Sequence, residues 1–172
     1  MSDFQKTQRL WAPWRMEFIR QPKERGCFLC RIIAEGSERD ASNFVVRRGQ
    51  RCLLFMNRYP YSPGHLLVAP YRHMGELEAL AVEERSEMME LACLGACLLT
   101  GTCHPHGFNM GINQGAAAGA GLEDHAHMHV VPRWEGDTNF MPVVGGVRVM
   151  PQALEEMHAA LMAELGRMGA GA

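Results

Sequence analysis

The 172-residue sequence has no long apolar run and no large excess of charge of either sign. No stretch approaches the roughly 18 apolar residues of a membrane-spanning helix, so we expect no membrane span. Seventeen Lys and Arg stand against nineteen Asp and Glu. This balance argues against a protein that coats DNA or RNA, because such proteins carry a strongly basic face. It leaves room for a small anionic ligand at one local site.

Signal-peptide features and internal repeats are also missing. The first residues, MSDFQKTQRLW, lack the apolar core of an export signal, so we expect a cytoplasmic protein in a reducing compartment. There, the six cysteines and eight histidines are expected to be metal ligands, catalytic groups or buried residues rather than disulfides. The length predicts one domain over residues 1–172, with an N-terminal arm (1–25), a core (26–135) and a C-terminal extension and helix (136–172).

Hydrophobic periodicity and turn signals predict an α+β fold. The pattern indicates a short helix, three strands, one long helix, two further strands and a closing helix. Their expected ranges are 27–34, 43–47, 52–56, 65–69, 76–100, 108–113, 125–131 and 151–168. Pro70 and Pro132 are expected to stop the third and fifth strands. Short connections favour a mainly antiparallel sheet of about five strands, with the long helix between strands three and four.

The most informative segment is 125–131, HAHMHVV. Alternate residues of a strand share a face, so His125, His127 and His129 are expected on one face and three apolar residues on the other. Each buried imidazole needs a polar partner, so packing alone does not explain three in alternation. The three rings could bind one metal ion, or one could be a nucleophile while the others position a phosphate.

A loop rich in glycine and alanine, residues 114–122, leads into this segment. Glycines let backbone N–H groups approach an anion closely, as loops that hold phosphate do. The loop therefore favours the phosphate interpretation over a shared metal ion. A flexible connector is the alternative for the loop taken alone.

On the pattern His-φ-His-φ-His-φ-φ, where φ is apolar, the sequence resembles the histidine triad (HIT) family of nucleotide hydrolases and nucleotidyl transferases. Other segments resemble the bacterial diadenosine-tetraphosphate phosphorylase and fragile histidine triad-like subgroup: LWAPWRME (10–17), NRYP (57–60), PGH (63–65), GFNMGIN (107–113) and VPRWEGDTNFMP (131–142). The resemblance implies a HIT-like fold, a nucleotide or dinucleoside polyphosphate substrate, and a homodimer.

The resemblance also implies residue roles. The middle histidine, His127, would attack the α-phosphorus through Nε2 to give a covalent nucleotidyl-histidine, which water or phosphate then releases. Phosphate contacts are implied for His129, Asn113, Gln114 and the amides of Gly119 and Gly121, ribose contacts for Asn57, and support of the pocket for His65. The family often has Ser, Thr or Gln shortly before its first histidine, where this sequence has Gly121 and Leu122. Backbone amides would replace that side chain.

Three alternatives stand beside this function. The substrate could be a nucleoside phosphoramidate, or the protein could be a nucleotide-binding regulatory module with low turnover. A metal-dependent hydrolase with a three-histidine catalytic ion is the third.

The two-residue spacing of Cys27 and Cys30 is typical of half a zinc site. A thioredoxin-like redox motif lacks its βαβ context here, and two buried cysteines on a short helix is the other alternative. The resemblance to bacterial HIT proteins implies that His73 and His125 complete the site. A closed Cys₂His₂ site would be structural, not catalytic.

Overall fold

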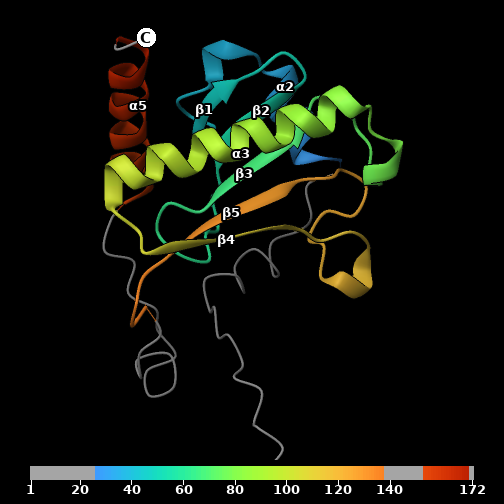
Figure 1. Cartoon of the computed structure of the whole chain (residues 1–172). Coiled ribbons are helices and arrows are strands. Elements are labelled where there is room, and N and C mark those ends of the chain that lie inside the picture. The colour runs from blue at the N-terminus through green and yellow to red at the C-terminus, as the bar shows by residue number, and fades with distance from the viewer. Residues whose placement is uncertain (1–25, 138–152, 171–172) are drawn as a thin grey trace, which may run out of the picture.

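The computed structural model describes residues 26–137 and 153–170 (Figure 1). The expected N-terminal arm, with its LWAPWRME segment, and residues 138–152 lie outside the described residues. Within the described ranges, no helix combines the length and hydropathy that crossing a membrane requires. The elements, with 3₁₀ helices written η, are α2 (Phe28–Ala34), η1 (Ser37–Arg39), β1 (Val45–Arg48), β2 (Cys52–Met56), β3 (Leu66–Pro70), η2 (Leu77–Ala79), α3 (Val82–Cys103), β4 (Gly107–Ile112), η3 (Ala116–Ala118), β5 (Met128–Arg133) and α5 (Leu154–Ala170).

The five strands form one antiparallel sheet in the order β1-β2-β3-β5-β4, which confirms the α+β prediction. The predicted hairpin joins β1 and β2, where the Gly49 N–H donates to the Cys52 carbonyl at 2.8 Å. The long helix α3 lies between β3 and β4 in the chain, as expected. β4 forms one edge of the sheet, and its last residue, Ile112, pairs with Met128 at the start of β5.

The sheet has a packed core on each face. α3 and α5 cover one face, where Leu54, Val68 and Val130 are buried (Figure 1). The alternate residues Leu53 and Leu67 belong to a second core, which includes Leu29 of α2. Because successive side chains of a strand point to opposite faces, strands buried on both sides are apolar throughout, as in β2 and β3.

The start of the long helix differs from the prediction. Helical spacing of apolar residues placed it at residue 76, but α3 begins at Val82. Leu80 and Ala81 have extended backbones, with ψ of 145° and 156°, and they separate η2 from α3. The Ala81 N–H donates to Glu84 Oε2 at 2.7 Å, so a side chain of the first turn satisfies the amide that precedes the helix.

Of the two prolines predicted to stop strands, Pro70 does end β3, but Pro132 lies inside β5, which ends at Arg133, so the prediction for Pro132 was wrong. Pro70 is the last residue of β3, and Pro132 is in β5 opposite Phe108. Proline is tolerated where its missing N–H faces no neighbouring strand. β3 pairs with β5 only over Met128–Val130, and beyond it the Ser62 hydroxyl donates to the Pro132 carbonyl at 3.1 Å.

Candidate active site and metal cluster

The histidine segment enters β5 from a bend, because the strand begins at Met128 rather than at residue 125. The predicted alternation is present nonetheless. Ala126, Met128 and Val130 are buried in the core that contains α3. His129 pairs with Leu67 of β3, whose side chain belongs to the opposite core. The ring centroids of His127 and His129 lie 5.1 Å apart.

His127 has its proton placed by the main chain. Its Nδ1 lies 2.9 Å from the carbonyl oxygen of His125, which can only accept a hydrogen bond. Nδ1 therefore carries the proton, and Nε2 carries a lone pair. His127 is 7% exposed, and this burial lowers its pKa, while the bond to the His125 carbonyl acts in the opposite direction. A neutral imidazole with Nε2 unprotonated is the form that can act as a nucleophile.

His129 has the opposite tautomer, set through His65. The Tyr61 N–H and the Asn57 amide Nδ2 both lie at Nδ1 of the fully buried His65, at 3.0 and 3.2 Å. Since both are donors, His65 Nδ1 accepts, and its Nε2–H donates to Nδ1 of His129 at 3.0 Å. His129 therefore carries its own proton on Nε2. Neighbouring rings thus offer one lone pair and one donor.

Asn57 contacts His65 rather than standing apart from it. Its Oδ1 accepts the Tyr59 N–H at 2.9 Å, which orients Nδ2 toward His65. An amide has two donor hydrogens and two acceptor positions, so these contacts use half of its capacity. The ribose contact implied for Asn57 stays a prediction.

The residues expected to hold phosphate separate into two groups. Asn113 directly follows Ile112, the partner of Met128, so it lies at the end of β4 beside the histidine segment. Gly119 and Gly121 lie in the exposed loop between β4 and β5, and Gly119 has φ of +83°. Gln114 instead bonds to η2, with its Oε1 accepting the Leu77 N–H and its Nε2 donating to Glu78. Their contacts with phosphate stay predictions.

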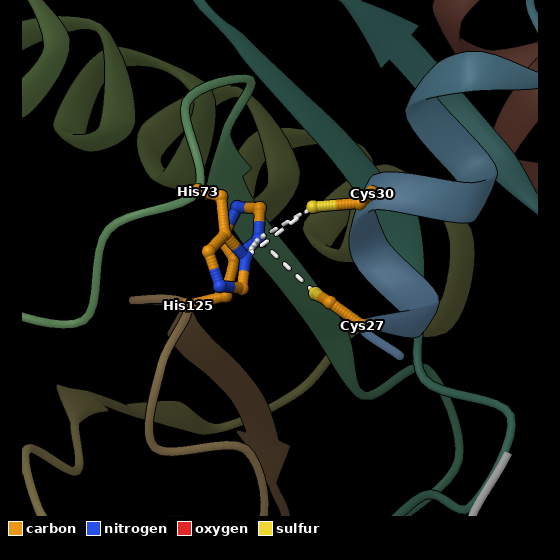
Figure 2. Close-up of side chains that lie close together, drawn as sticks. All are labelled: Cys27, Cys30, His73 and His125. Carbon is orange, nitrogen blue, oxygen red and sulfur yellow. Dashed lines mark hydrogen bonds between the residues drawn. The ribbon is translucent and has the colours of Figure 1, made fainter. Parts of the chain in front are cut away.

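The four residues predicted as metal ligands form one cluster. The possible ligand atoms of Cys27, Cys30, His73 and His125 all lie within 4.8 Å of one another. They come from the start of α2, the segment after β3 and the bend before β5, and they point toward one another (Figure 2). Residues almost 100 positions apart in the sequence therefore meet at one point, and the described residues contain no second such group of three or more.

The distances in this cluster suit a tetrahedral ion. Zinc bonded to sulfur at about 2.3 Å and to nitrogen at about 2.0–2.1 Å would hold S and N ligands about 3.5 Å apart, and two N ligands about 3.3 Å apart. His125 Nδ1 lies 3.2 Å from Cys27 Sγ, 3.7 Å from Cys30 Sγ and 3.3 Å from His73 Nδ1. Cys30 Sγ lies 3.3 Å from His73 Nδ1.

The tautomer of His125 also suits a metal ligand. Its Nε2 lies 2.8 Å from the Pro70 carbonyl, so Nε2 carries the proton and Nδ1 presents a lone pair to the cluster. Burial lowers the pKa of His125 and favours this neutral form, while burial and the neighbouring Cys27 raise the pKa of the Cys30 thiol. A cation among the donors would instead favour the thiolate.

Main-chain groups are what the sequence could not reveal at this site. The carbonyls of His125 and Pro70 and the N–H of Tyr61 fix the tautomers of three rings. Every residue has such groups, so no residue type marks them in a sequence. Their positions follow from the bend before β5, the end of β3 and the turn before β3.

Comparisons with known proteins agree with this geometry. The model of the HIT domain matches residues 38–136. The chain is 39% identical over 166 residues to the AP-4-A phosphorylase of Mycobacterium tuberculosis strain H37Rv, covering 93% of this chain and 85% of that protein. It is 30% identical over 93 residues to the asymmetrical bis(5'-nucleosyl)-tetraphosphatase of Schizosaccharomyces pombe, covering 54% and 50%.

Among solved structures, the crystal structure of a Zn-bound histidine triad family protein from Mycobacterium smegmatis is similar, with a TM-score of 0.69 and 26% identity. The match covers 86% of this chain and 98% of that chain. The fold, the histidine segment, and the matches over most of the chain agree. The chain therefore belongs to the HIT family.

Proposed function

We propose that this HIT enzyme cleaves dinucleoside polyphosphates of the diadenosine tetraphosphate type through a covalent nucleotidyl-His127. The observation that carries the proposal is the pair of opposed tautomers, with a lone pair on His127 Nε2 and a proton on His129 Nε2. The 39% identity to an AP-4-A phosphorylase supports the substrate class.

The reaction would proceed in two displacements. His127 Nε2 attacks the α-phosphorus, the P–N bond forms, and the P–O bond to the leaving nucleotide breaks. His129 donates its Nε2 hydrogen bond to phosphate or to the leaving oxygen, where negative charge develops. An oxygen of water or phosphate then attacks the same phosphorus, and the P–N bond breaks.

Other groups at this end of the sheet would bind the rest of the substrate. Asn113 and the amide of Gly121 suit the non-bridging oxygens, because they lie beside the end of β4 or in the loop that leads to His127. The Gly119 N–H donates to the Ala116 carbonyl at 2.9 Å, so a phosphate contact of this amide would replace or share that bond. The remaining donor and acceptor of Asn57 suit the ribose hydroxyls.

The test is to trap the intermediate and follow the products. We expect mass spectrometry of briefly quenched protein to find one AMP on His127, and His127→Ala to abolish turnover. With diadenosine tetraphosphate, ADP plus ATP in the presence of phosphate would indicate phosphorolysis, and AMP plus ATP would indicate hydrolysis. Full turnover by His127→Ala would refute the mechanism. Tight AMP binding with negligible turnover of any dinucleotide or phosphoramidate would indicate a regulatory module instead.

We further propose that the cluster of Cys27, Cys30, His73 and His125 binds a structural zinc ion. Four protein donors leave no open position for substrate, which is typical of a structural rather than a catalytic site. A bound ion would cross-link α2, the segment after β3 and the segment before β5. Elemental analysis should find one zinc per chain.

A homodimer in the cytoplasm completes the proposal. β4 is an edge strand, and Met110 on it is 43% exposed, so a second copy pairing along this edge would cover backbone and apolar surface together. All six cysteines are free thiols, as in a reducing compartment. Sedimentation should give twice the chain mass, and Met110→Lys should shift it toward the monomer.

A further inference from the structure

One short segment touches both the metal cluster and the chain that leads into the triad. We call residues 73–79 the strap; it begins at His73 and ends with η2. The Ala126 N–H donates to the Met74 carbonyl at 2.7 Å, next to His125 and His127. A side chain at Gly75 has no room, since a Cβ there would clash with the Glu123 carbonyl oxygen. The strap therefore packs closely on residues 123–126.

The far end of the strap holds a glutamine side chain. The Leu77 N–H donates to Gln114 Oε1 at 3.1 Å, and Gln114 Nε2 donates to Glu78 Oε2 at 3.1 Å. Only one orientation of the amide satisfies both contacts, because its oxygen must face an N–H and its nitrogen a carboxylate. The pKa of Glu78 is lowered by its own backbone amide first and by Gln114 second, so the carboxylate accepts in its ionised form.

The strap thus fastens both ends of the glycine- and alanine-rich loop. Residue 114 begins the loop at η2, and residues 123–126 end it at Met74 and Gly75. Among the described residues, the middle of the loop is held only by short-range hydrogen bonds around η3, in which the N–H groups of residues 118–120 donate to the carbonyls of Gly115 and Ala116. A Cβ on Gly115, Gly119 or Gly121 would meet nothing within 4 Å, and residues 116–119 are exposed. Such a loop needs anchors at its ends to keep its amides in one place.

We propose that Gln114 is a positioning residue, which ties the loop to the strap so that the loop amides stay aligned beside the triad, and not a direct ligand of the phosphate. This inference rests on the proposed function only for its effect on turnover. The contacts of Gln114 with Leu77 and Glu78, which we call the tie, are a property of the free protein. The Gly75 contact at one end and the Gln114 contact at the other would restrain the loop together.

The experiment uses three variants of the full chain: Gln114→Glu, Glu78→Gln and the double variant. Gln114→Glu keeps an acceptor for the Leu77 N–H but sets two carboxylates against each other. Hydrogen exchange of the hydrogen-bonded loop amides, those of residues 118–120, should then rise about 2- to 10-fold, the factor that one lost hydrogen bond corresponds to. In the double variant, the amide of residue 78 donates to the carboxylate of residue 114, so exchange should return to the wild-type rate.

Turnover of diadenosine tetraphosphate is the second measurement, with Glu83→Gln, an exposed glutamate of α3, as the control. We expect Gln114→Glu to raise KM or lower kcat, and the double variant to return the changed constant toward its wild-type value. Unchanged exchange in Gln114→Glu, or exchange that the double variant does not restore, would overturn the tie. Restored exchange without restored turnover would overturn the positioning role in favour of direct phosphate contact. If the wild type turns over no dinucleotide while exchange behaves as expected, the proposed function fails and the tie stands.

Discussion

At the scale of single residues, the chemistry of the site depends on which ring nitrogen carries each proton. The sequence predicts which histidines gather, because the alternation of 125–131 places them on one face of a strand. It does not predict their tautomers. The groups that decide, the His125 carbonyl and the Tyr61 N–H, are brought to the rings by a bend and a turn of the backbone.

The tautomers are directly measurable. We expect long-range proton–nitrogen NMR spectra of the histidine rings to show His127 protonated on Nδ1 and His129 protonated on Nε2. The reason is that the partner at Nδ1 is an acceptor for His127 and a donor for His129. The exposed His104 serves as an internal reference for a ring in fast tautomer exchange. The same tautomer on both rings would contradict the assignment.

His65 should matter for both stability and turnover. In His65→Ala, the Tyr61 N–H and the Asn57 amide lose a buried acceptor, so the free energy of unfolding should fall by about 2–3 kcal/mol. His129 loses the donor that fixes its tautomer, so kcat should fall about 100-fold. The control is His158→Ala, which removes a hydrogen bond between α5 and the Val45 carbonyl of β1. Neither residue belongs to the histidine segment, so kcat should be unchanged. Equal kcat losses in both variants would indicate a general structural effect.

At the scale of elements, the types of helix and strand were predictable, but several ends were not. Apolar periodicity identifies α3, yet Leu77 and Leu80 also fit that period, so the sequence extends the helix too far toward its N-terminus. The boundary is set by the contacts of one side chain, Glu84. Glu84 accepts the Ala81 N–H and also binds Arg72, from the segment after β3.

Glu84 gives a prediction with a defined pH dependence. The hydrogen bond from Arg72 is the largest influence and holds the pKa of Glu84 below its ordinary value. Burial opposes it as the second-largest effect, and the Ala81 amide lowers the pKa further. A carboxyl whose pKa is lower in the folded state stabilises the fold at pH values above its unfolded-state pKa of about 4.3. This stabilisation is lost as the pH falls through the folded-state pKa. Because Arg72 is partly exposed, Glu84→Gln should reduce unfolding free energy by only about 1 kcal/mol at pH 7.

Urea unfolding at several pH values measures this difference. It should shrink steadily below pH 4, where Glu84 itself becomes protonated. Glu83→Gln, on the neighbouring exposed position, should show no comparable difference at pH 7. If the difference in unfolding free energy between wild type and Glu84→Gln stayed constant down to pH 3, the ion pair would not be its cause.

At the scale of the whole molecule, the metal cluster joins segments that are distant in the sequence. The Cys27–Cys30 spacing predicts half of the cluster, and only the resemblance to a family adds His73 and His125. The two halves meet because β3 and β5 are neighbours in the sheet and α2 packs on that face. This topology is a property of the complete fold, so it could not be deduced from the cysteine spacing.

Metal removal should therefore destabilise the whole fold. At a free zinc concentration about 100 times the Kd, binding raises the free energy of unfolding by about 2.7 kcal/mol. For a chain of this size, that corresponds to a rise of about 5–10 °C in Tm. We expect a chelator, or Cys27→Ser, to lower Tm by that amount and to remove zinc in elemental analysis. Cys93→Ser, at an exposed cysteine of α3, should do neither. Unchanged melting in Cys27→Ser would exclude a structural metal.

His125 serves both sites through different atoms. Its ring faces the metal cluster, while its carbonyl oxygen holds the ring of His127. In evolutionary terms, this sharing restricts the order in which substitutions can accumulate. A lineage that discards the cysteines must first secure the peptide group of residue 125 by other means, or the nucleophile loses its orientation before any catalytic residue has changed. Descendants without the cysteines should therefore carry new packing around this bend.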